Sequence, residues 1–377
     1  MTFKLFSRAN VRRCEGANAR QCEGASTRVR IVTVMAALPI AGMLVARPAE
    51  AATYGGSATG AVVTVPATGT TIRAATGAIS ISGGGAEAAL LVGDIPGSAT
   101  GGVVSLAAGV MHAAIVGLDA TRAEASMANI TLTVSNNTIT ADFIMARGTT
   151  SCGPAVAGDS TLPNLVINGQ AITVTGVPNQ VVSLPNGTAT INEQTSSIGA
   201  TSAAITVNAL HVVTTDPITQ AQLADVVLAQ AAPQIDCSSG TPPNANFTTG
   251  GGYVTGDTGG RTNFGAVGGI QQNGSFMGHL VVDDHSVNFT FQSTSVDAVD
   301  PSTPCQTTYS GSGNYSSSAG SGTATYSVTI HDVATPGSAG DTFSVQIPAG
   351  TGAIYTNGVN IQLLGGNITA HSSLCPH

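Results

Sequence analysis

The sequence predicts an all-β protein with two antiparallel β-sandwich-like domains in tandem. Two observations lead to this prediction: apolar and polar residues alternate in short runs, and Asn-Gly pairs separate many of these runs. The composition agrees with it. Charged residues make up 8% of the 377 residues, against about a quarter in typical proteins, and Gly occurs 47 times. This composition excludes a coiled coil and a polytopic membrane protein.

Alternation with a period of two predicts strands that each have one buried face. The runs are rich in Val, Ile, Thr and Phe, which favour strands. They lie at 61–65, 78–82, 129–134, 138–146, 203–213, 279–282, 286–292, 324–330 and 341–347. The segment 216–232 has two interpretations, because Asp216 and Pro217 have the pattern of a helix start. A strand over 223–230 is the alternative, and we follow it because of the resemblance described below.

Turn signals between these runs predict antiparallel neighbours, because Asn and Gly tolerate the positive φ angles of tight hairpins. They are Ser135-Asn136-Asn137, Asn168-Gly169, Asn186-Gly187, Asn273-Gly274 and Asn357-Gly358. The low-complexity segment 310–322 (SGSGNYSSSAGSG) is expected to be a flexible hairpin loop.

The N-terminal 51 residues have the pattern of a signal peptide. An arginine-rich stretch precedes the apolar run 31–45, which is shorter than the roughly 20 residues of a spanning helix. Small residues then predict cleavage between Ala51 and Ala52. The alternative is an uncleaved anchor. A start codon assigned too far upstream would explain the length of the leader. We expect no membrane span after cleavage.

Charge is distributed unevenly along the chain. Eight of the 12 Lys and Arg residues precede Ala52, so residues 52–377 contain four Arg, no Lys and 17 acidic residues, a net charge of −13. Such a surface repels phosphate backbones, and we expect no nucleic-acid partner. A Ser/Gly/Pro/Asn-rich stretch predicts the domain boundary. The expected organisation is a first β domain at 52–240, a linker at 241–249, a second at 250–371 and a tail at 372–377.

Four cysteines remain in the exported chain, and an even number predicts disulfides. Three pairings are possible, and the spread favours one bridge in each half, Cys152–Cys237 and Cys305–Cys375. A free Cys375 that joins neighbouring molecules is the alternative. Metal binding is the weaker interpretation, because no C-x-x-C spacing is present.

Catalytic motifs are missing from the sequence: there is no G-x-S-x-G, H-E-x-x-H, G-x-G-x-x-G or P-loop. The seven His are scattered, and His211 and His279 lie in alternating strands, where a hydrogen-bonded wall residue is the usual interpretation. We therefore assign no catalytic residue and no cofactor. The tyrosines that could form a carbohydrate platform show no common spacing: Tyr253, Tyr309, Tyr315 and Tyr326.

Two acidic clusters could hold a cation, namely Asp283-Asp284 with His285, and the pair Asp332 and Asp341. Carboxylates that cap turns are the preferred interpretation, since calcium loops carry several Asp or Asn at alternate positions. We assign no metal. For Glu193, a buried hydrogen-bonding role is preferred to half of a catalytic carboxylate pair.

Several segments resemble the choice-of-anchor P family of exported bacterial proteins. They are ASMANITLTVSNNTITADFIMARG (125–148), LVINGQAITVTGVPNQVVSLP (165–185), ATINEQ (189–194), ITVNALHVV (205–213) and ADVVLAQA (224–231). Residues 248–371 look like the domain that often follows this one. The resemblance implies β domains and export, and it implies no activity. The sorting signal for which the family is named is absent here, which leaves attachment to the cell open.

Three classes of function follow. The leading hypothesis is a secreted or cell-surface structural or matrix protein without enzymatic activity, which would contact cell-envelope or matrix components. The second is a glycan- or protein-binding adhesin, which would need an exposed aromatic or acidic groove. The third is an extracellular hydrolase, which would need convergent His or carboxylate groups in a cleft. The sequence assigns no ligand-binding residue.

Overall fold

The computed structural model describes residues 52–75, 84–237, 246–256, 258–271, 273–333, 340–349, 352–371 and 375. The expected signal peptide, the strand expected at 78–82 and the first five residues of the expected linker lie outside this part of the chain. The described residues are almost entirely in antiparallel strands, as the sequence predicts. Apart from strands they contain two short 3-10 helices, at Pro66–Thr68 and Gly97–Thr100. No helix of this part has the length and apolar character that a membrane crossing requires.

The strands form three sheets, which we call A, B and C. Sheet A contains, in spatial order, β11 (Gln180–Leu184), β12 (Gly187–Ile198), β13 (Ser202–Thr215), β14 (Gln222–Asp236), β1 (Thr53–Val65) and β2 (Thr70–Ala75). Sheet B contains, in spatial order, β10 (Gln170–Ala171), β9 (Val166–Ile167), β7 (Asn137–Ser151), β6 (Ala120–Val134), β5 (Met111–Gly117) and β3 (Gly84–Leu90). In addition, β4 (Val104–Ala107) pairs with β6, and β8 (Ala155–Thr161) pairs with β7.

Sheet C is made by the second half of the chain. Its order is β18 (Phe289–Ser293), β17 (Phe276–Asp284), β16 (Arg261–Ile270), β15 (Asn246–Thr255), β24 (Ile361–His371), β22 (Thr342–Ala349), β21 (Gly320–His331), β20 (Gln306–Ser317) and β19 (Ala298–Asp300), with β23 (Gly352–Thr356) beside β22. Strand β18 also pairs with β20, so the sheet closes on itself.

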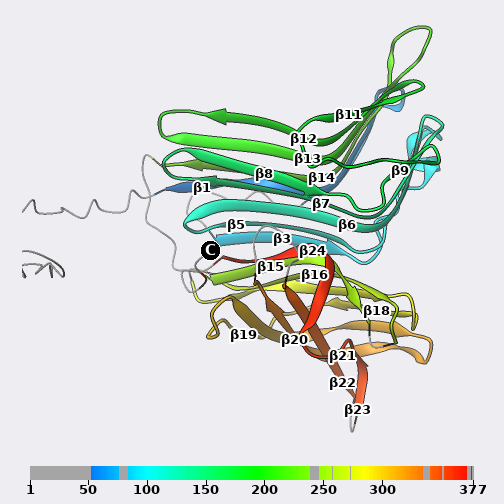
Figure 1. Ribbon diagram of the computed structural model, residues 1–377. Coiled ribbons are helices and arrows are strands. Elements are labelled where there is room, and N and C mark those ends of the chain that lie inside the picture. Colours follow the sequence, from blue (N-terminus) through cyan, green and yellow to red (C-terminus); the bar gives the residue numbers. More distant parts are fainter. Residues whose placement is uncertain are drawn as a thin grey trace, which may run out of the picture. The chain divides into compact units, whose positions relative to one another are not determined.

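Sheets A and B pack face to face as a sandwich, with β14 and β13 against β6, β7 and β8 (Figure 1). Alternate residues of both sheets fill the space between them, and they include Val63, Ile115, Ile144, Val207 and Leu228. Burial of a side chain of this size stabilises the fold by about 1.5–3 kcal/mol. The inward-facing positions of these strands are therefore apolar, and this produces the alternation seen in the sequence.

The core of the second half lies inside the closed sheet C and is rich in aromatic rings. Phe264 stacks on Phe343 with ring centroids 3.9 Å apart, and Phe289 stacks on Tyr355 at 4.2 Å. The first half is therefore a sandwich of two sheets, whereas the second is a single sheet that encloses its own core.

The outer face of sheet B meets sheet C, and the described residues all belong to one compact unit. Strand β17 contacts β3, while β15 and β16 contact β5 and β6. Apolar groups lie in this junction: Val116 and Leu118 pack on Phe247, and Phe143 packs on Tyr253. Polar groups lie there as well, and they form the site described below.

Three local expectations can be compared with the structure. Residues 222–236 form a strand, so the alternative of a helix is wrong and the strand is confirmed. Strand β15 begins at Asn246, within the segment expected to be a linker. The expected loop at 310–322 is instead a long hairpin of β20 and β21 in which Ser317 pairs with Gly320. The alternation of apolar and polar residues is not visible in this segment, because glycines occupy buried positions of the hairpin. At Gly313, for example, there is no room for a side chain, since a Cβ atom would lie 2.4 Å from Phe291.

Candidate functional site

Four ionisable side chains form a continuous chain of contacts in the junction between sheets B and C. His112 on β5 contacts Glu124 on β6, with 2.8 Å between Nε2 and Oε1. Its other nitrogen, Nδ1, lies 2.9 Å from Nε2 of His279 on β17. His279 Nδ1 in turn contacts Glu87 Oε2 on β3. We call this chain Glu124–His112–His279–Glu87 the relay.

The strands explain why these groups meet. Glu87 and Glu124 are the two cross-strand partners of Ala114, which lies two residues from His112 on β5. Because side chains alternate between the two faces of a strand, Glu87, His112 and Glu124 lie on the same face of sheet B. Opposite it, Gly265 of β16 leaves the space that the imidazole needs, because a Cβ there would lie 2.6 Å from His112 Cβ. The side chain of His112 is fully buried, and that of His279 is 8% exposed.

The three hydrogen bonds of the relay need three protons. Each bond requires one proton between its two atoms, supplied by a ring N–H or a carboxyl O–H. Two carboxylates and two imidazoles that share three protons carry a net charge of −1. The three contacts are therefore satisfied together only by this number of protons.

Burial is the largest influence on the pKa of His279 and lowers it, while the neighbouring Glu87 opposes that shift. Burial by itself would raise the pKa of Glu87, but the charge of His279 and the hydrogen bond with it lower the pKa overall. Glu87 is therefore ionised in its contact with His279.

A cavity of about 280 Å³ adjoins the other end of the relay. The residues that line it include Glu124, Arg122, Arg147, Asp159 and His371. Arg122 pairs with Asp119, with 2.6 Å between Nη1 and Oδ1, and Arg147 donates from Nε to Asp159 Oδ1 at 2.9 Å. Two of the four arginines of residues 52–377 thus lie at one cavity.

A second ionisable network lies on the outer face of sheet A. His211 of β13 is held between two carboxylates, with 2.8 Å from Nδ1 to Glu193 Oε2 and 3.0 Å from Nε2 to Asp225 Oδ1. Asn208 donates to Glu193 at 2.6 Å. The hydrogen bond with Asp225 is the largest influence and, with the help of Glu193, raises the pKa of His211 to about 9.

An irregular backbone conformation at Asn192 brings Glu193 to that face. Asn192 has a φ of 52° and is left out of the pairing of β12 with β13, which continues from Ile191–Leu210 to Glu193–Asn208 without a change of register. Glu193 is a hydrogen-bonding partner, as expected, but its side chain is 29% exposed, so the expectation that it is buried is wrong.

The acidic clusters noted in the sequence are held by internal contacts. Asp284 accepts hydrogen bonds from Thr262, Ser286 and Tyr355 at 2.5–2.9 Å. Asp283 contacts His285 at 3.0 Å.

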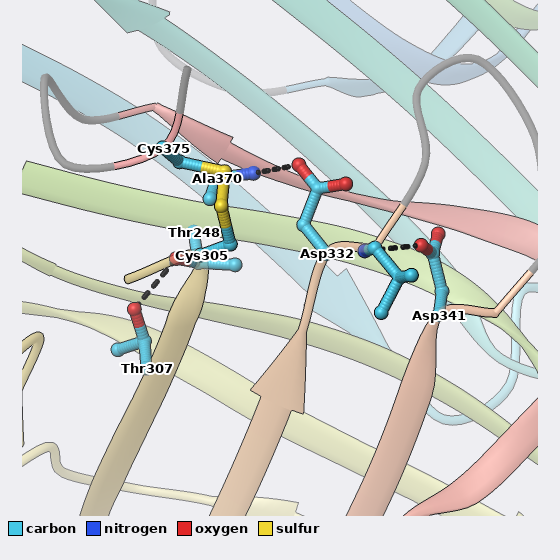
Figure 2. Close-up of a disulfide and its surroundings, with 8 residues drawn as sticks. Thr248, Cys305, Thr307, Asp332, Asp341, Ala370 and Cys375 are labelled. Carbon is cyan, nitrogen blue, oxygen red and sulfur yellow. Dashed lines mark hydrogen bonds between the residues drawn. A yellow bond between two sulfur atoms is a disulfide. The ribbon is translucent and has the colours of Figure 1, made fainter. Parts of the chain in front are cut away.

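The carboxylates of Asp332 and Asp341 each accept backbone N–H groups. Asp332 accepts from Ala370 at 2.8 Å, and Asp341 accepts from Val333 at 2.9 Å (Figure 2). Asp341 also accepts from the backbone of Ile368 at 3.0 Å. The two carboxylates therefore connect β21 and β22 to neighbouring backbone. Within the described ranges, no group of three or more His, Cys, Asp or Glu has the arrangement of a metal site.

The cysteines pair as the sequence favours. Cys152 bonds to Cys237 with 5.7 Å between their Cα atoms, and Cys305 bonds to Cys375 at 4.6 Å. Figure 2 shows the second bridge beside the Thr248–Thr307 hydrogen bond between β15 and β20. Each bridge lies within one half of the chain. Ala52, the expected first residue of the exported chain, is buried.

The four tyrosines do not form a platform. Tyr309 and Tyr326 are buried in the core of sheet C, and Tyr315 stacks on Phe289. Tyr253 lies under the guanidinium of Arg261, 3.8 Å from its ring centroid.

The sequence drew attention to His211, His279 and Glu193, and all three belong to the networks above. It missed Glu87, His112, Glu124 and Asp225. A usable signal was present for two of these, Glu87 and His112, because each is a lone ionisable residue within an alanine-rich strand: GGAEAAL and MHAAIVG. Such a residue in a buried strand requires a partner.

Comparison of the chain with protein-family models, with curated proteins and with solved structures finds no match. The resemblance to the choice-of-anchor P family therefore stays a prediction.

Proposed function

We propose that this is an exported structural protein of the cell surface or extracellular matrix, without enzymatic activity. One observation carries the proposal: the ionisable side chains that could have served catalysis are engaged in contacts that join strands and sheets. The relay connects β3, β5, β6 and β17, and the His211 network connects β12, β13 and β14.

The disulfides and the composition of the chain also suit a protein that persists outside the cell. Two disulfides close loops of 85 and 70 residues, and bonds of this kind persist in oxidising compartments. The absence of lysine from residues 52–377 leaves few sites for trypsin-like proteases. The signal-peptide pattern and the family resemblance support export.

Fractionation of the producing cells, followed by intact mass spectrometry, tests the proposal. We expect a species that begins at Ala52 in the surface or medium fraction. A cytoplasmic species that retains Met35 would contradict it. The second candidate function, binding of a ligand as in an adhesin, is favoured by the cavity beside Glu124.

A further inference from the structure

The cavity at the junction of sheets B and C has two buried polar groups on its lining residues that lack partners in the described part of the chain. One is Nη1 of Arg147, whose Nε and Nη2 are both bound to Asp159. The other is Nδ1 of His371, a residue that is 4% exposed and whose Nε2 lies 2.9 Å from the Thr249 hydroxyl. A buried guanidinium N–H without an acceptor costs about 1–3 kcal/mol. An occupant of the cavity that supplies an acceptor oxygen would remove this cost.

The charges around the cavity favour a neutral occupant. Each guanidinium is already matched by a carboxylate, since Asp119 pairs with Arg122 and Asp159 with Arg147. His371 adds no positive charge at neutral pH, because burial, with the nearby Arg122, lowers its pKa to about 3. An anion would therefore meet no unmatched positive charge at the cavity.

The apolar part of the lining consists of small side chains. Glu124 and Arg147 are direct partners on β6 and β7, and alanines lie on either side of this pair, with Ala114 on β5 and Ala157 on β8. Side chains of this size leave room for a methyl group. The cavity volume of about 280 Å³ exceeds that of a few waters, each of which occupies about 30 Å³ in the liquid.

We propose that this cavity binds a neutral amide with a small apolar substituent, such as an acetamido group. Its carbonyl oxygen accepts from Arg147 Nη1, its N–H donates to the carboxylate of Glu124, and its methyl group lies against the alanines. The relay keeps Glu124 in place, because Oε1 is bound to His112. An acetamido group can belong to an N-acetylated sugar or to an acylated peptide, and both present the same chemistry.

This inference goes beyond the structural role proposed above and does not depend on it. Fractionation tests the location of the protein, whereas the cavity is tested by binding to the purified protein. A negative result in one experiment would not contradict the proposal that the other experiment tests.

Titration of the ¹⁵N-labelled protein with N-methylacetamide, followed by NMR of the Arg147 Nε–H and His371 ring signals, tests the proposal. We expect saturable shifts of both signals and at least tenfold weaker binding of sodium acetate. Parallel titrations with N-acetylglucosamine and with N-acetylalanine methylamide distinguish a sugar from a peptide as the source of the amide. The compound that binds more tightly identifies the source. Absence of saturable shifts with all of these probes would mean that water alone fills the cavity and would overturn the proposal.

Variants of β8 provide a matched control. Ala157→Leu places a larger side chain at an exposed position of the cavity wall, so we expect at least tenfold weaker binding of N-methylacetamide. Ala155→Leu makes the same change two residues away, on the same face of the strand and outside the lining, and should bind as the unaltered protein does. Arg147→Lys keeps a positive charge beside Asp159 but removes Nη1, and should also weaken binding. Equal affinities of all three variants would overturn the proposal.

Discussion

His112 Nδ1 lies 2.9 Å from His279 Nε2, although the two residues are 167 positions apart in the chain and belong to different sheets. This contact joins the outer face of sheet B to sheet C. Because each histidine also contacts a glutamate, the link consists of three hydrogen bonds in series, and all of them depend on the same three protons. The junction of the two halves is therefore sensitive to the loss of any member.

Replacement of His279 by Leu should lower the free energy of unfolding by about 3–5 kcal/mol, because it leaves the Glu87 carboxylate without its partner in a largely buried place. Urea denaturation at pH 7 measures the change. The double variant His279→Leu with Glu87→Leu should recover part of the loss, since the unpaired charge is then gone. The matched control is His331→Leu on β21, outside the relay. An equal loss in the control would contradict the assignment.

Stability should fall as the pH is lowered from about 6.5. The pKa of His279 is lowered by burial, so its stabilising effect is present above the unfolded value of 6.5 and is lost as the pH falls below it. The lowered pKa of Glu87 acts in the same direction at more acidic pH, below its ordinary value of 4.5. Urea midpoints between pH 4.5 and 7 measure the slope. His279→Leu should flatten it between pH 5.5 and 7, and an unchanged slope would contradict this assignment.

The network on sheet A should show the opposite dependence. The pKa of His211 is raised to about 9, so its contribution to stability is fully present below 6.5 and is lost as the pH rises through 9. An NMR titration of the His211 ring should give a midpoint near 9. Asp225→Asn, which removes the main cause, should move the midpoint toward 6.5, and a midpoint near 6.5 in the unaltered protein would show that the network does not form.

Each disulfide should contribute about 4 kcal/mol if it acts by restricting the unfolded chain, given loops of 85 and 70 residues. Non-reducing peptide mapping should recover Cys152 with Cys237 and Cys305 with Cys375. A peptide that joins Cys375 to a second Cys375 would contradict the pairing. The variant Cys305→Ala with Cys375→Ala should lower the urea midpoint without altering the first bridge.

Much of the fold could be predicted from local pattern. The strands expected at 129–134 and 138–146 lie in β6 and β7, and the turn between them has Ser135 and Asn136 at φ angles of 47° and 68°, as a tight hairpin requires. Such features depend on neighbours in sequence. The hairpin of β20 and β21 was missed because glycines replace the buried apolar residues that would have shown its period.

The candidate site could be predicted only in part, because its contacts depend on register and on irregular backbone positions. Glu87 meets His279 across 192 positions, and no local pattern encodes that distance. Likewise, regular alternation would place Glu193 on the buried face with Ile191, whereas the chain has a positive φ at Asn192 and Glu193 lies beside His211. The lone charges in alanine-rich strands showed that partners must exist, but they did not show which partners.

Cleavage of the chain between its halves tests most directly whether the relay holds them together. A protease site inserted within 238–245 would separate two fragments that no disulfide connects. Sedimentation velocity of the cleaved protein at pH 7 should show one species, and the cleaved variant His112→Leu with His279→Leu should show two. Separation of the unaltered fragments at pH 7, or a variant that stays together, would contradict the role assigned to the relay.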